Sequence, residues 1–150
     1  MTINIRKYQT HDLKGLLIVW EKSSRLAHPF MANSFFEQER DNIPNIYIPN
    51  TDTQVITVDG VVVGFIALIE GENSGVKNCE IGGLFVDPNY HGQKLGKALV
   101  DFAVDKYGPL TVKVLKENHL GRSFYNKYGF AFMREITWEP TGDILIELKC

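Results

Sequence analysis

Residues 81–99 read I-G-G-L-F-V-D-P-N-Y-H-G-Q-K-L-G-K-A-L, and the fold follows from this stretch. Its apolar start predicts a strand, which Pro88 ends because proline has no backbone N–H to donate to a sheet. From Leu95 onward, apolar residues recur at the spacing of a helix with one buried face. The loop of residues 90–96 therefore leads into a helix N-terminus, where unpaired N–H groups and the helix dipole favour a bound phosphate.

Hydrophobic periodicity and turn signals divide the rest of the chain into further elements. Runs rich in β-branched and apolar residues predict strands at residues 3–8, 54–58, 61–69, 79–86, 110–115, 131–138 and 143–149. Amphipathic spacing predicts helices from Thr10 to near Ser24, from a capping box at Ser34 to before Pro44, from Leu95 to before Gly108, and from Asn118 to Gly129. This order indicates a mixed α/β fold.

Short turn and glycine signals indicate how the central strands meet. Asp59-Gly60 separates two strand-like runs and favours a type I′ turn, so a β-hairpin is expected there. The polar residues 71–78 are expected to form a loop. Gly82-Gly83, inside the next strand, indicates a bulge or a close backbone approach. The strand at residues 110–115 should run parallel to that strand, because a helix supplies the crossover.

Length, composition and charge limit the class of protein. The 150 residues, 44% hydrophobic and 23% charged, suit one domain spanning residues 1–150. A net charge of −2 gives no electrostatic case for nucleic acid or an anionic membrane as partner. No apolar run has the length of a membrane span and no signal peptide is visible, so we expect a cytoplasmic protein. Cys79 and Cys150 predict free thiols, and the singly placed histidines predict no metal site.

The central stretch resembles motif A of the GNAT superfamily, the acyl-CoA-dependent N-acetyltransferases. Residues 86–90 fit its V-x-P-x-[YF] turn, and Gly92 and Gly96 stand where that family commonly has glycines. Two positions depart from the pattern: His91 replaces the usual Arg or Gln, and Lys94 replaces the middle glycine. A residue with a Cβ at position 94 must avoid positive φ or tolerate strain, and its ammonium can approach a phosphate.

A second stretch, Asn118 to Phe130, resembles the family pattern N-x6-Y-x3-G-F. The resemblance implies that Tyr125 is the general acid that protonates the departing CoA thiolate, a role that contributes roughly 10²–10⁴-fold to the rate. The alternative is a core tyrosine that covers the sheet. Asn118 has two readings as well: a contact with the pantetheine end of the cofactor, or a helix cap.

The resemblance covers nearly the whole chain and implies a single GNAT domain with a central mixed, V-splayed sheet of about seven strands flanked by about four helices. It implies acetyl-CoA as cofactor and direct transfer to a primary amine, either a protein lysine or N-terminus or a small-molecule amine. The small bacterial acetyltransferases it most resembles include some that modify lysine side chains. The protein is expected to be a monomer or homodimer. The implied cofactor contacts are Leu84, Phe85, Val86, His91, Gly92, Gln93, Lys94, Leu95, Gly96, Lys97 and Asn118.

The acceptor side carries less motif content. Glu80 is the candidate general base, with a solvated carboxylate near the strand end as the alternative; His28 and Glu37 are weaker candidates. The segment from His28 to Phe30 resembles a substrate-side wall, or else it is a turn with a buried aromatic anchor. A non-catalytic CoA-binding module is the rival function. A Rossmann-type nucleotide-binding protein is disfavoured, because no G-x-G-x-x-G follows the first strand.

Overall fold

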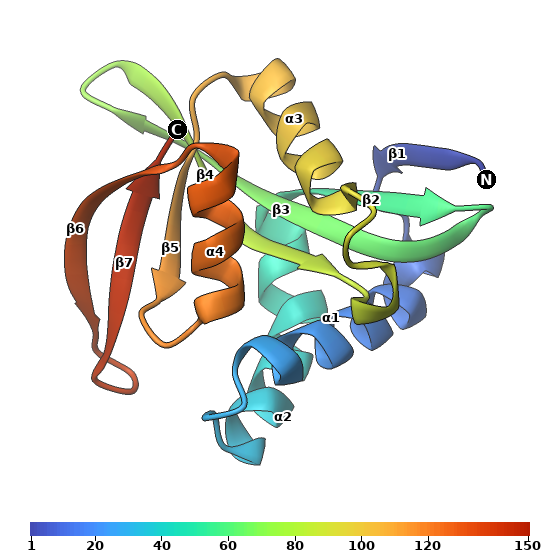
Figure 1. Cartoon of the computed structure of the whole chain (residues 1–150), viewed down its shortest axis with the longest axis horizontal. Helices are drawn as coiled ribbons and strands as arrows, with labels where there is room; N and C mark the ends of the chain where they lie inside the picture. The colour runs from blue at the N-terminus through green and yellow to red at the C-terminus, as the bar shows by residue number, and fades with distance from the viewer.

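The fold is built on one mixed sheet of seven strands in the order β1-β2-β3-β4-β5-β7-β6 (Figure 1). The computed structural model describes residues 1–150, apart from the side chain of Asn73. The strands are β1 (Ile3–Lys7), β2 (Asp52–Val58), β3 (Val61–Asn73), β4 (Val76–Val86), β5 (Thr111–Leu115), β6 (Ala131–Trp138) and β7 (Asp143–Lys149). The α-helices are α1 (Leu13–Ala27), α2 (Asn33–Asn42), α3 (Leu95–Tyr107) and α4 (His119–Tyr128).

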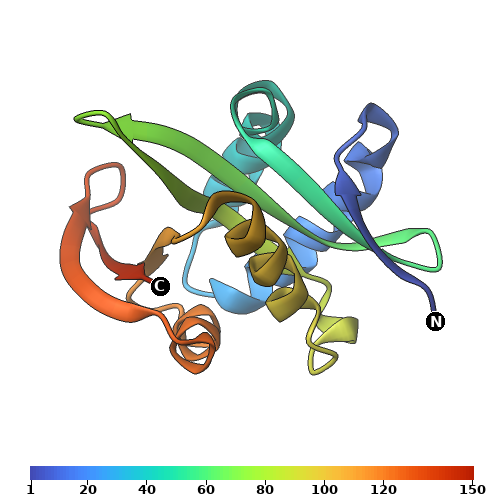
Figure 2. The ribbon, with the colours of Figure 1, turned by 90° about the horizontal axis from the view of Figure 1, so that it is seen from above.

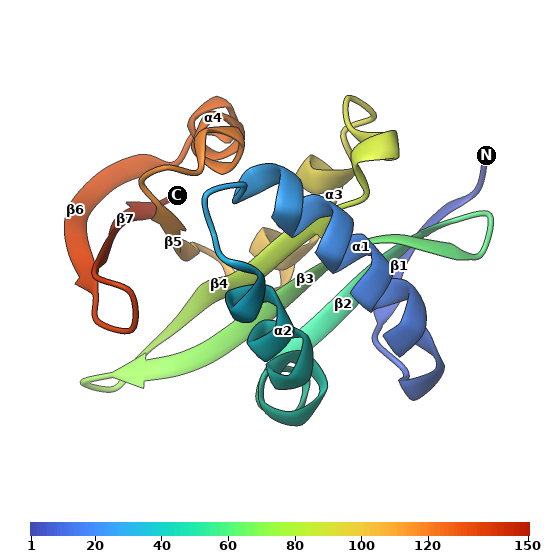
Figure 3. The same cartoon turned by 90° about the horizontal axis from the view of Figure 1, so that it is seen from below.

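Two helices cover each face of the sheet. α1 and α2 bury Leu16, Trp20 and Phe36 against one face, in a cluster with Phe65 of β3. α3 packs Leu99 and other apolar residues on the opposite face, together with apolar side chains of α4. Figure 3 shows α1 and α2 crossing the strands, whereas Figure 2 views the molecule from the side of α3. None of the helices in the described part of the chain has the length and apolarity needed to cross a membrane.

The sheet splits open between β4 and β5. These neighbours are parallel, and only two residue pairs join them: Glu80 with Thr111, and Ile81 with Val112. The split begins at a β-bulge, because β3 pairs Ala67 with Gly83 and Leu68 with Ile81, which leaves Gly82 as the extra residue. The predictions of a bulge at the glycine pair, of a parallel β5 and of a splayed seven-stranded sheet are therefore confirmed.

Two turns of the same type shape the long strands of the sheet. Asp59 and Gly60 have φ values of 50° and 84°, as the predicted type I′ hairpin requires. The prediction of a loop at residues 71–78 was wrong, because β3 and β4 continue there and meet at a second turn, Ser74-Gly75, with φ values of 54° and 82°. The described side chains at this end of the hairpin are exposed and mostly polar, and this polarity was misread as a loop.

The two N-terminal helices differ from their predicted limits. α1 does not end near Ser24 but continues to Ala27, since Ser24 is buried against the fold. α2 begins at Asn33 with Ala32 as its N-cap, so the capping box predicted at Ser34 was wrong. Its chain then passes Pro44 in a wider π-type turn, Ile43–Tyr47. Pro44 is tolerated there because it stands in the first turn of the new helical segment, where a backbone N–H is not needed.

Candidate active site

The loop that follows β4 is held against the end of that strand. The Asp87 carboxylate accepts the backbone N–H of Asn89 at 3.0 Å and closes a single helical turn. The His91 ring donates from Nε2 to the carbonyl of Val86 at 3.0 Å. The family resemblance implied that His91 contacts the cofactor; in the structure its Nε2 fastens the loop to the strand.

The N-terminus of α3 is open. Its first i→i−4 hydrogen bond runs from the N–H of Ala98 to the carbonyl of Lys94, at 3.0 Å. The N–H groups of residues 95–97 therefore have no partner within the helix, and with the helix dipole they form an anion site. Lys94 is the N-cap and adopts a left-handed φ of 63°, which is costly for a residue with a Cβ. The sequence left open whether position 94 avoids positive φ or tolerates strain, and in the structure Lys94 has positive φ and tolerates the strain.

Two cavities meet beside the split in the sheet. The larger, of about 920 Å³, lies along the glycine-containing loop and the N-terminus of α3. The smaller, of about 430 Å³, lies between the α1–α2 side and β5. Residues from β4, from α4 with its N-cap, and from the end of α1 line both cavities: His28, Leu84, Phe85, Asn118 and Tyr125. A molecule bound in one cavity therefore reaches a molecule bound in the other at this junction.

The larger cavity fits an extended thioester cofactor with a diphosphate. The open N–H groups of α3 lie at its wall, and the edge of β4 beyond the bulge, residues 83–86, has no partner in β5. Gly96 lets α3 pack closely against Phe124 of α4 at this wall, because a Cβ at that position would lie only 3.1 Å from Cε1 of Phe124. A strand edge that faces a cleft offers backbone groups to an extended, amide-containing ligand.

Tyr125 lies at the junction with its ring fixed. It is buried, with 6% of its surface exposed, and its ring packs edge-on against Phe124 and Phe130 at centroid distances of 5.2 and 5.1 Å. Burial raises the pKa of the Tyr125 phenol above its ordinary value. The phenol therefore stays protonated at neutral pH and can serve as a proton donor.

Asn118 and His28 bridge α4 and the end of α1 at the same junction. The Asn118 side-chain oxygen accepts the N–H of Gly121 at 2.9 Å and caps α4. Its amide nitrogen donates to Nε2 of His28 at 3.2 Å, and the other ring nitrogen lies 3.4 Å from Oγ of Ser24. Burial lowers the pKa of His28, against the opposing effect of a hydrogen bond to the backbone of Ser24. His28 is therefore neutral at pH 7, as an acceptor of the Asn118 hydrogen bond must be.

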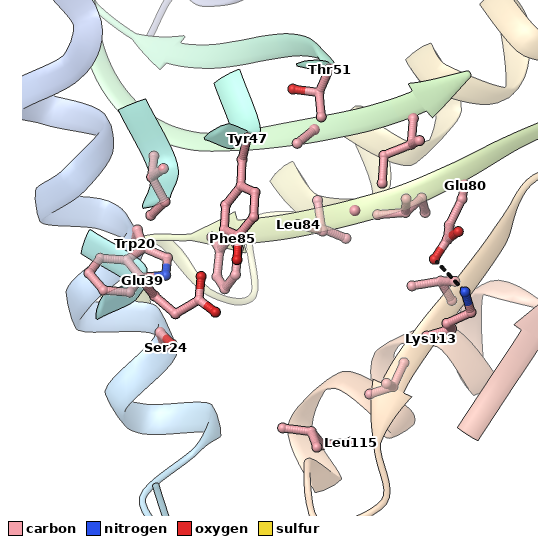
Figure 4. Close-up of a pocket in the computed structure, with 18 of the residues that line it drawn as sticks. Trp20, Ser24, Glu39, Tyr47, Thr51, Glu80, Leu84, Phe85, Lys113 and Leu115 are labelled. Atoms are coloured by element: carbon pink, nitrogen blue, oxygen red, sulfur yellow. Dashed lines mark ion pairs between the residues drawn. The ribbon is translucent and has the colours of Figure 1, made fainter. Parts of the chain in front are cut away.

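Charged groups stand on opposite sides of the smaller cavity (Figure 4). On one side, the Glu80 carboxylate forms an ion pair with Lys113 of β5, at 3.5 Å. On the other side, Glu39 of α2 points its carboxylate into the cavity beside Phe85. Glu80 thus lies in a cavity, as expected of a general base, but its charge is already matched by a lysine.

Glu39 and Tyr47 are cavity residues that the sequence analysis missed. Glu39 follows the buried Phe36 by three residues and precedes the buried Ile43 by four, so all three lie on the inner face of their helical segment. Helical spacing was the signal that could have found Glu39. Glu37, which the sequence analysis named instead, is exposed.

Most of the predicted site residues lie around the two cavities. Ten of the implied cofactor contacts line the larger one: Leu84, Phe85, Val86, His91, Gly92, Lys94, Leu95, Gly96, Lys97 and Asn118. Gln93 is exposed on the loop and does not line the cavity. Phe30 also lies outside the linings, and its ring contacts His28 edge-on at 5.8 Å. Among the described side chains, no three His, Cys, Asp or Glu residues are grouped as a metal ion would require.

The fold and the paired cavities define an acyltransferase class, and the comparison with known families names it. Residues 18–130 match the model of the acetyltransferase (GNAT) family. The chain belongs to this family, and the prediction of an N-acetyltransferase is confirmed. 

Characterised relatives match over most of their length. The peptidyl-lysine N-acetyltransferase YjaB of Salmonella typhimurium is 31% identical over 87% of this chain and 84% of its own. The peptidyl-lysine N-acetyltransferase YiaC of Escherichia coli is 28% identical over 90% and 87%. Among solved structures, the PaiA N-acetyltransferase of Thermoplasma acidophilum in complex with coenzyme A has the same fold, with a TM-score of 0.80, 24% identity and full coverage of both chains.

Proposed function

We propose that this protein transfers an acetyl group from acetyl-CoA to the side-chain amine of a lysine in a peptide or protein. The observation that carries the proposal is the junction of the two cavities at Tyr125, opposite the unpaired edge of β4. The larger cavity suits the cofactor, and the smaller one suits an amine on an apolar stem. Relatives at 31% and 28% identity are peptidyl-lysine N-acetyltransferases, which favours lysine over other amines.

Each side of the junction has a defined task in this reaction. Acetyl-CoA, when bound, supplies the acetyl group as a thioester. The open N–H groups of α3 bind its diphosphate, and the edge of β4 at residues 83–86 aligns its pantetheine arm. Backbone N–H groups freed near Leu84 polarise the carbonyl that the amine attacks. Holding both reactants in line at the junction is the largest source of rate.

The chain also directs the protons. A lysine ammonium has a pKa of about 10.4, so it must lose a proton before its nitrogen attacks. The carbon–nitrogen bond forms as the carbon–sulfur bond breaks, and Tyr125 gives its proton to the departing thiolate. The phenol is then restored by solvent. Glu80, which forms an ion pair with Lys113 at 3.5 Å, or water takes the amine proton.

The proposal extends to the whole chain as one catalytic domain, residues 1–150, that works in the cytoplasm as a monomer or homodimer. Two observations support this wider setting. Strands from both ends of the chain join one sheet. The cysteines Cys79 and Cys150 are free thiols, as is usual in a reducing compartment.

An acetylation assay with matched peptides tests the acceptor class. We expect the protein and acetyl-CoA to acetylate a peptide that has a blocked N-terminus and a single lysine, with the added mass on the lysine nitrogen in fragment spectra. The same peptide with norleucine at that position should stay unmodified. Acetylation of free N-termini but not of lysine would contradict the proposal, and CoA binding without transfer to any amine would favour the non-catalytic module.

A further inference from the structure

The smaller cavity contains one carboxylate without a cationic partner. Glu80 is paired with Lys113 at 3.5 Å. Glu21, on the neighbouring helix, is paired with Arg40 and Arg25. Glu39 makes no ion pair with any side chain that the structure describes, although it is only partly exposed. A carboxylate in such surroundings is costly unless a counter-charge or hydrogen bonds stabilise it.

The surroundings of Glu39 suit a cation on an apolar stem. Aromatic side chains from the face of the sheet that α1 and α2 cover, and from the last hairpin, line the cavity: Trp20, Phe35, Phe65, Phe85 and Trp138. Aromatic rings attract ammonium groups through their faces and pack against methylene chains. Tyr47 lies beside the carboxylate: burial, and next the nearby Glu39 carboxylate, raise the pKa of this phenol to about 12. A protonated phenol and a carboxylate together leave a net negative charge.

We infer that Glu39, supported by Tyr47, is the residue that selects a cationic acceptor, by binding the ammonium of the incoming lysine in the smaller cavity. At neutral pH lysine arrives charged, so the site that captures it must supply the opposite charge. Glu39 meets this need because its charge is free, whereas Lys113 already neutralises Glu80. The inference rests on the proposed function, because it names how that acceptor is recognised.

Recognition by Glu39 affects binding and not the chemical step. A carboxylate that holds an ammonium also favours its charged form, and proton loss must follow before attack. Removing the carboxylate therefore weakens capture of the acceptor without slowing the transfer itself. The expected signature of Glu39→Gln is a KM for the lysine peptide at least about tenfold higher with kcat nearly unchanged, since hydrogen bonds to charged groups contribute more than one factor of ten.

The two tryptophans of the chain give a direct readout, because both line this cavity. The probe is n-butylamine, which reproduces the lysine side chain, and 1-butanol is its uncharged counterpart. Titrated into the CoA-saturated protein, butylammonium should change the indole signals of Trp20 and Trp138 at concentrations at least tenfold below those that butanol needs. In Glu39→Gln this preference for the cation should disappear.

Two further variants separate a binding role from a structural one. Glu37→Gln changes an exposed carboxylate of the same helix and should bind butylammonium as the wild type does. Tyr47→Phe should weaken the binding about fivefold, because it removes the polar hydroxyl beside the Glu39 carboxylate. Unchanged butylammonium affinity in Glu39→Gln would overturn the inference. If Glu39 governs butylammonium binding but no lysine peptide is acetylated, the inferred site stands and the proposed function fails.

Discussion

Replacement of Tyr125 by phenylalanine is expected to lower kcat about 10²-fold while leaving the affinity for CoA unchanged. The change removes only the hydroxyl that donates the proton to the departing thiolate. The ring remains, and its edge contacts with Phe124 and Phe130 hold the fold of the junction. Stopped assays of thiol release give kcat, and a thermal shift with CoA gives the binding control.

The control for this variant is Tyr8→Phe. Tyr8 packs in the cluster beneath α1 but lines neither cavity, so the turnover of this variant should match that of the wild type. If Tyr125→Phe retains the wild-type kcat, Tyr125 is a core residue and not the general acid. If it loses CoA binding as well, the phenol holds the cofactor and the role in proton transfer is not supported.

The second large effect is expected on stability, at the end of the sheet where α3 meets β2. The buried Asp52 carboxylate accepts hydrogen bonds from Lys106 at 2.7 Å, Gln54 at 2.7 Å and Lys7 at 3.1 Å. It thus ties together β1, β2 and the C-terminus of α3. Asp52→Asn removes the charge that accepts these hydrogen bonds; because both lysines are partly solvated, we expect the free energy of unfolding at pH 7 to fall by about 2 kcal/mol.

The pH dependence gives a second check on Asp52. Burial acts to raise the pKa of this carboxyl, but the hydrogen bonds from Lys106, Tyr107, Gln54 and Lys7 outweigh it and hold the pKa below the ordinary value. In the unfolded chain an aspartate titrates near 3.9. The stabilisation is therefore present in full above that pH and is lost as the pH falls toward the lower folded pKa.

Urea unfolding at several pH values measures this difference. The gap between the wild type and Asp52→Asn should be constant from pH 7 to about pH 5 and should shrink below about pH 4. Asp105→Asn, which alters an exposed carboxylate on α3, is the matched control and should change stability by less than about 0.5 kcal/mol. A gap that grows on acidification would contradict the account of the Asp52 cluster.

Local backbone chemistry made much of the fold predictable. A type I′ turn requires positive φ at both central positions, and Asp-Gly is one of the few residue pairs that adopt it readily, as Asp59-Gly60 does here. A β-bulge places one extra residue in a strand and bends that strand, and glycines in a strand interior often mark such a site. Gly82-Gly83 therefore predicted the bulge in β4. Pro88 and the apolar spacing after Leu95 define the strand end and the helix start. Each of these signals acts within a few residues, so the sequence alone contains it.

Tertiary surroundings decided what the sequence did not predict. Residues 71–78 have the polarity of a loop, but cross-strand pairing continues the hairpin through them. Ser34 has the spacing of a cap, although Ala32 takes that place in the chain. Glu39 was missed because its importance comes from a missing counter-charge, which depends on where Lys113 and the arginines lie. The pairing of Glu80 with Lys113 was likewise invisible, since two separate strands bring them together.

The proposed function depends above all on one feature: the open N-terminus of α3 holds a diphosphate and so directs a thioester to Tyr125. A crystal structure of the protein with CoA bound tests this claim most directly. We expect the diphosphate within hydrogen-bond distance of backbone N–H groups of residues 92–97, and the sulfur beside the Tyr125 hydroxyl where the two cavities join. A diphosphate bound elsewhere, or a phenol turned away from the sulfur, would contradict it.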